Sequence, residues 1–151
     1  MKQEIIDTLK DYRYIIALIS VFNFLLTPIH IAVSGFNPAY VVVVNFTLVI
    51  LGSSLIAFAK TAKVVTYILG AMTLVFIWME FSDGDSKPLM LTRLLVSLAL
   101  FITFCVLLLK ELKKIKKINL QFILLPILGF LYLGIIGGIL FEVMHLADSK
   151  S

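Results

Sequence analysis

Glu142 and His145 are the residues whose types and spacing come closest to a chemical site. They stand three positions apart in an apolar stretch, so on a helix they share one face. A Glu-x-x-His pair can bind metal, but a dinuclear site in a helical bundle needs two such pairs and further carboxylates. The sequence contains one such pair, with His30 as the only other histidine. We therefore expect an outer polar pair that is hydrogen-bonded or faces water, without metal or cofactor.

Arg93 is the second candidate, as one half of an ion pair. It is the single charged residue in the apolar run 89–109, and Glu80 closes the preceding run. Asp83 and Asp85 lie in the connecting segment and are alternative partners. A voltage-sensing helix carries several arginines through the membrane field. One arginine near the rim instead predicts an ordinary membrane helix with a structural Glu80–Arg93 pair.

The sequence lacks the motifs of common catalytic sites. It has no Gly-rich phosphate loop, no HExxH and no GxSxG. Catalysis needs placed acids, bases or metals, and the apolar runs contain few polar residues. Its one cysteine, Cys105, lies in mid-run and is interpreted as a small buried hydrophobe. We expect a protein that is not an enzyme, and its net charge of +4 does not indicate nucleic acid as a partner.

Long apolar runs must position these residues. The chain has 151 residues, of which 61% are hydrophobic and 15% charged. Runs of roughly 18 to 25 apolar residues can cross the hydrocarbon core as helices, whereas an open strand in lipid leaves its backbone groups unsatisfied. The predicted fold class is all-α, a polytopic membrane helical bundle. The predicted spans are residues 14–30, 39–59, 64–79, 89–109 and 120–143.

The predicted organisation is a four-helix bundle and a fifth transmembrane helix joined by a basic linker. Its parts are a cytoplasmic N-terminal segment (1–13), the bundle (14–109), the linker (110–119), the fifth helix (120–145) and an extracytoplasmic tail (146–151). The linker carries Lys110, Lys113, Lys114, Lys116 and Lys117, with an apolar residue at every third position between them. Such a segment is typical of an interfacial helix with lysines at the lipid headgroups. The alternative is a topology signal alone.

The placement of positive charge predicts the orientation in the membrane. Ten Lys and Arg residues fall on the side of the N-terminus and the linker, and three on the other side. The positive-inside rule then places the N-terminus in the cytoplasm and the C-terminus outside. We expect a multipass protein of the cell membrane, with the lipid bilayer as its first partner.

Two pairs of residues are predicted to join helices. Gly134 and Gly138 form a small-xxx-small pair in the fifth span, which allows a close approach by another helix of this chain or of another subunit. Asn23 and Asn45 are polar residues at membrane depth, and we expect them to hydrogen-bond between helices inside the bundle.

Three stretches resemble a known family. DYRYIIALISVFNFLLTP is similar to the first helix of a bacterial six-helix potassium-channel-like subunit, LLLKELKKIKKIN to its linker, and LPILGFLYLGIIGGILFEVMHLADSKS to its outer pore helix. The resemblance implies the front portion of such an ion channel subunit, and a tetramer as the homo-oligomer. The sequence has no loop of the TVGYG type, which potassium selection needs.

The leading functional expectation is the non-voltage-sensing transmembrane portion of a cation (potassium) channel subunit. Its role would be scaffold and assembly, without a selectivity filter in this chain. The alternative is a small stand-alone multipass protein that acts as an accessory or interaction subunit. Whether a cation binds to these residues stays open.

Overall fold

The expected all-α fold is confirmed by a computed structural model, which describes residues 1–57, 60–83 and 86–148. The described residues form α1 (Lys2–Leu25), α2 (Thr27–Ser34), α3 (Pro38–Ser54), α4 (Lys60–Asp83), α5 (Lys87–Lys114) and α6 (Leu120–Asp148). Three features predicted above lie outside the described residues: the end of the second span at residue 59, Asp85 as an ion-pair partner, and the end of the tail at 149–151.

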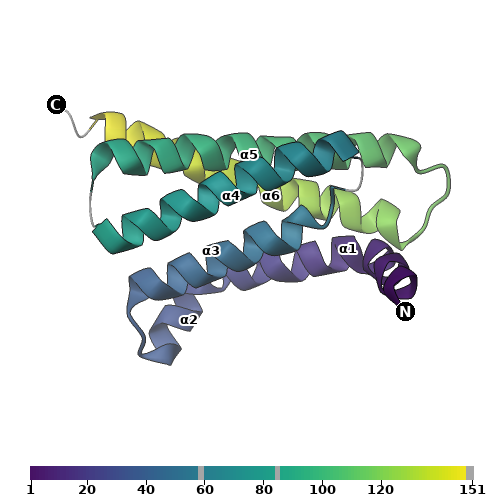
Figure 1. Cartoon of the computed structure of the whole chain (residues 1–151), viewed down its shortest axis with the longest axis horizontal. Coiled ribbons are helices and arrows are strands. Elements are labelled where there is room, and N and C mark those ends of the chain that lie inside the picture. Colours follow the sequence, from purple (N-terminus) through teal and green to yellow (C-terminus); the bar gives the residue numbers. More distant parts are fainter. Residues whose placement is uncertain (58–59, 84–85, 149–151) are drawn as a thin grey trace.

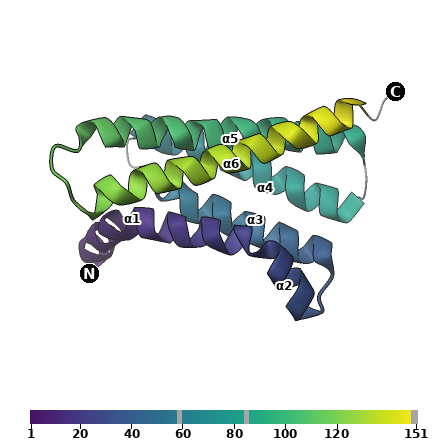
Figure 2. The same cartoon turned by 180° about the vertical axis from the view of Figure 1, so that it is seen from behind.

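The helices form two layers, and the helices other than α2 run roughly along the same long axis (Figure 1). One layer contains α1, α2 and α3, and the other contains α4, α5 and α6, with α5 packed against both α4 and α6. The layers join where α3 meets α4 and where α1 meets α6. The N-terminus and the α5–α6 loop lie at one end, and α2 and the C-terminal end of α6 lie at the other (Figure 2).

The first predicted span is bent rather than continuous. Residues 14–30 were expected to form one helix, but α1 ends at Leu25 and α2 leaves it at an angle of 56°. The cause is Pro28, which lacks an N–H group and whose ring clashes with the carbonyl of Phe24 in a straight helix. The Thr27 hydroxyl donates to that carbonyl instead, at 2.5 Å. This bond gives the carbonyl a side-chain donor in place of the N–H that Pro28 lacks.

Three helices, α4, α5 and α6, are long and apolar enough to cross a membrane, which is compatible with a multipass membrane protein. The bent α1–α2 pair gives a fourth span if both parts are counted together. The remaining expected span, residues 39–59, corresponds to α3, which has 17 residues. At about 1.5 Å per residue, α3 is shorter than the hydrocarbon core. It ends at Ser54, whose hydroxyl donates to the carbonyl of Ile50 at 2.6 Å.

Residues 110–119 were expected to form a separate linker helix, and this prediction is wrong. Helix α5 continues to Lys114, and residues 115–119 form a loop. Lys113 and Lys114 lie in the last turn of α5, where positive charge is favourable beside the exposed carbonyls of a helix C-terminus. Asn119 then starts α6, because its side-chain oxygen accepts from the N–H of Phe122 at 3.0 Å. The lysines thus belong partly to a membrane helix and partly to a loop.

Aromatic rings fill the core between the two layers. Phe46 of α3, Phe101 and Phe104 of α5 and Tyr132 of α6 are all buried. The ring centroids of Phe46 and Phe101 lie 6.0 Å apart, and those of Phe104 and Tyr132 lie 5.5 Å apart. Tyr132 also donates its hydroxyl to Ser53 Oγ at 2.5 Å. This hydrogen bond ties α6 to α3 and satisfies two buried hydroxyl groups.

Among the glycines that the structure describes, Gly52 has the closest neighbour, at the point where α3 crosses α1. A Cβ atom built on Gly52 would lie 2.7 Å from the Cβ of Ser20. Real Cβ atoms do not come so close, so only glycine fits at this crossing.

Candidate functional site

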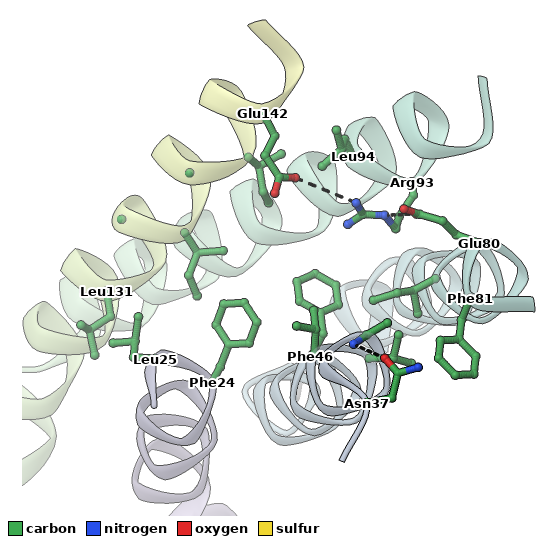
Figure 3. A pocket seen from close by; sticks show the side chains of 18 of the residues that line it. Phe24, Leu25, Asn37, Phe46, Glu80, Phe81, Arg93, Leu94, Leu131 and Glu142 are labelled. Atoms are coloured by element: carbon green, nitrogen blue, oxygen red, sulfur yellow. Dashed lines mark hydrogen bonds and ion pairs between the residues drawn. The ribbon is translucent and has the colours of Figure 1, made fainter. Parts of the chain in front are cut away.

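Arg93 joins three helices at the end of the bundle that holds α2 and the C-terminal end of α6. Its Nε donates to Oε2 of Glu80 at 2.5 Å, and its Nη2 lies 3.9 Å from Oε2 of Glu142 (Figure 3). The structure thus brings Glu80 and Arg93 together across the α4–α5 connection. We call Glu80, Arg93 and Glu142 the Arg93 cluster. The side chains of Arg93 and Glu80 are 14% and 20% exposed, whereas that of Glu142 is 58% exposed. Glu142 is therefore the more accessible carboxylate.

Glu142 and His145, predicted as an outer polar pair that is hydrogen-bonded or faces water, are both exposed. Among the described residues, Glu142 forms its ion pair with Arg93 and not with His145. His145 is exposed, and both residues border a small cavity of about 180 Å³ next to Met90. No group of three or more His, Cys, Asp or Glu side chains in the described part of the chain could hold a metal ion. The contact with Arg93 was missed because it joins residues far apart in the sequence.

A cavity of about 870 Å³ opens beside the Arg93 cluster, between the two layers. Residues of α1, α3, α4, α5 and α6 line it, together with Asn37, which caps α3. The lining is mostly apolar and includes four phenylalanines, which are Phe24, Phe46, Phe81 and Phe130. The three residues of the Arg93 cluster are the only charged residues in the lining. Figure 3 shows Glu142 and Arg93 on one wall and Phe24 and Phe46 below them.

Gly134 and Gly138 line the same cavity. An added Cβ at either position would meet nothing within 4 Å. The predicted pair therefore packs against no other helix within the described chain. In this structure its effect is to widen the cavity.

Asn45 is the centre of a polar network between α1, α2 and α3. Its Oδ1 accepts from Nδ2 of Asn23 at 3.1 Å, which confirms the predicted bond between helices. Its Nδ2 lies 3.0 Å from Thr27 Oγ1 and 3.1 Å from His30 Nδ1. Asn45 is only 6% exposed, so this network satisfies an amide that would be costly to bury alone. The network stabilises the bend between α1 and α2.

The lysine cluster lies at the opposite end of the bundle. It consists of five exposed lysines, which are Lys110, Lys113, Lys114, Lys116 and Lys117. Glu111 lies among them and accepts from Lys114 at 3.1 Å and from Arg13 of α1 at 3.3 Å. The two arginines of the chain thus lie at opposite ends, each paired with a carboxylate from another helix. The five lysines therefore present exposed positive charge at this end of the bundle.

The all-helical fold and its three long apolar helices are compatible with the class of helical multipass membrane proteins. No protein-family model, no curated protein and no solved structure matches the chain.

Proposed function

We propose that this chain is a non-voltage-sensing membrane scaffold that takes part in the assembly of a cation-channel-type subunit and does not select ions itself. The proposal rests on the ion pairs that hold the side chain of Arg93 in place. It is the only arginine in α5, and carboxylates from α4 and α6 hold it near one end of the helix. A charge fixed in this way at the rim adds little to voltage sensing, which needs several mobile charges. The resemblance of the three sequence stretches supports the same function.

The proposed assembly surface is the outer face of α6, which consists of Phe130, Leu133, Gly137, Phe141 and Met144. It lies opposite the buried residues of α6, and its large side chains are between 60% and 76% exposed. An added Cβ at Gly137 would meet nothing within 4 Å, so the backbone is open to another helix there. Small residues let membrane helices approach closely. In this proposal the N-terminus and the lysine cluster face the cytoplasm.

The mass of the full chain in a mild detergent tests the assembly. We expect a tetramer for the wild type, and for Gly137→Leu a dissociation at concentrations about tenfold higher. Ala71→Leu is the matched control, because it makes the same kind of change on an exposed position of α4. The control should remain a tetramer. A wild-type monomer across the concentration range would contradict the proposal and favour the alternative, a stand-alone accessory subunit.

A further inference from the structure

The Arg93 cluster has an imbalance of charge beside an apolar cavity. One guanidinium faces two carboxylates, so the charged part of the cavity lining has a formal charge of −1. Glu80 is close to Arg93 and mostly buried, which makes these two a nearly neutral pair. Glu142 is 3.9 Å from Arg93 and more than half exposed, so its negative charge is the least neutralised of the three. The site therefore complements a single positive charge.

The rest of the cavity complements an apolar body. Its volume of about 870 Å³ falls within the roughly 300 to 1,000 Å³ that is typical of small-molecule sites. Four phenylalanines and many aliphatic side chains form its walls. Aromatic rings also attract quaternary cations through the negative face of the ring. Such a lining can contact the apolar substituents of a ligand and also its positively charged centre.

We propose that this cavity binds an amphipathic monocation, a small molecule with a quaternary ammonium or phosphonium centre and apolar or aromatic substituents. Glu142 neutralises the cationic centre at the mouth, and the phenylalanines contact its substituents. Arg93 acts as a positioning residue, because it holds Glu142 beside the opening and keeps Glu80 neutralised. Gly134 and Gly138 leave the space that the substituents fill. The cavity shares Phe130 with the outer face of α6, but the charge complementarity that carries this proposal does not depend on the assembly proposed above.

Tetraphenylphosphonium is a suitable probe, with tetraphenylborate as its counterpart of the same shape and opposite charge. Binding is measured by equilibrium dialysis on the full chain in phosphatidylcholine nanodiscs, with the partition into empty nanodiscs subtracted. We expect saturable binding of one tetraphenylphosphonium per chain and no saturable binding of tetraphenylborate. Glu142→Gln should weaken tetraphenylphosphonium binding about tenfold, because it removes the negative charge and keeps the shape. Gly134→Leu should abolish binding, because the new side chain fills the cavity.

Two controls separate the site from general effects of charge and of small-to-large changes. Glu111→Gln removes a carboxylate that is also paired with an arginine, but at the other end of the bundle, and should retain the wild-type affinity. Ala71→Leu should do the same, because it lies outside the cavity lining. Circular dichroism of each variant establishes that it is folded before its affinity is compared.

Three results would overturn the proposal. One is the absence of saturable tetraphenylphosphonium binding, including the case in which native mass spectrometry shows a lipid in the chain that the probe does not displace. The second is binding of tetraphenylborate as tight as that of tetraphenylphosphonium. The third is a folded Glu142→Gln variant with unchanged affinity. Weaker binding in Glu142→Gln and loss of binding in Gly134→Leu, with both controls unchanged, support the proposal, whatever the oligomeric mass of the chain.

Discussion

The variant Arg93→Leu is expected to lose about 3 kcal/mol of stability. Arg93 is 14% exposed and holds the carboxylates of Glu80 and Glu142 next to each other. Its removal leaves two like charges at the edge of an apolar cavity, and breaking one partner of a mostly buried pair typically costs about 3 to 5 kcal/mol. We take the lower end, because Glu142 can turn toward water. Unfolding of the full chain by SDS titration, followed by circular dichroism, measures the loss.

A second substitution distinguishes lost pairing from lost packing. In Arg93→Leu/Glu80→Gln the buried carboxylate is also gone, so we expect a recovery of about 1 to 2 kcal/mol relative to Arg93→Leu. Lys114→Gln is the control, because it breaks an ion pair whose lysine is 71% exposed. Such exposed pairs contribute about 0 to 1 kcal/mol. Equal stability of Arg93→Leu and Lys114→Gln would show that the Arg93 cluster does not hold the three helices together.

The variant Gly52→Ala should destabilise the α1–α3 contact by about 2 to 3 kcal/mol. Its Cβ would lie 2.7 Å from Ser20 Cβ, so the two helices must move apart. The movement also weakens the packing around the polar network of Asn45, which joins the same helices. The same SDS titration measures this loss, and Ser20→Gly/Gly52→Ala should restore most of it by making room.

Gly129→Ala is the matched control for this change. A Cβ at Gly129 meets nothing within 4 Å, so alanine should be neutral or stabilise α6 by up to about 1 kcal/mol. If Gly52→Ala is as stable as Gly129→Ala, the close crossing of α1 and α3 is not present in the protein.

Hydropathy was sufficient to predict the long helices, because the length of an apolar run limits the structures that satisfy the backbone in lipid. It located α4, α5 and α6 and the all-α fold. It could not predict how far the helix bends near Pro28 or that α3 ends at Ser54. The linker was misjudged because alternating lysines and apolar residues fit the end of α5 as well as a separate helix.

For the sites too, contacts between residues close in the sequence could be predicted, and contacts between distant residues could not. Glu80 and Arg93 stand at facing ends of consecutive helices, so their charges and spacing suggested a pair. Glu142 is 49 positions from Arg93, and nothing in the sequence relates the two. The cavity depends on how side chains from five helices fill space, which no local pattern contains. The spacing of Gly134 and Gly138 predicted a close approach of another helix, but both residues border the cavity. The close helix crossing occurs at Gly52 instead.

The orientation of the chain in a sealed membrane is the most direct test of the account. Single cysteines are placed at Gln3, Ser86 and Lys117 in a Cys105→Ser background and treated with a membrane-impermeant maleimide in intact cells. We predict that Ser86→Cys reacts from outside, and that Gln3→Cys and Lys117→Cys react only after the membrane is permeabilised. This pattern places the N-terminus and the lysine cluster in the cytoplasm, as the positive-inside rule requires. Reaction of Lys117→Cys from outside, or of Gln3→Cys and Ser86→Cys from the same side, would contradict the membrane bundle proposed for this chain.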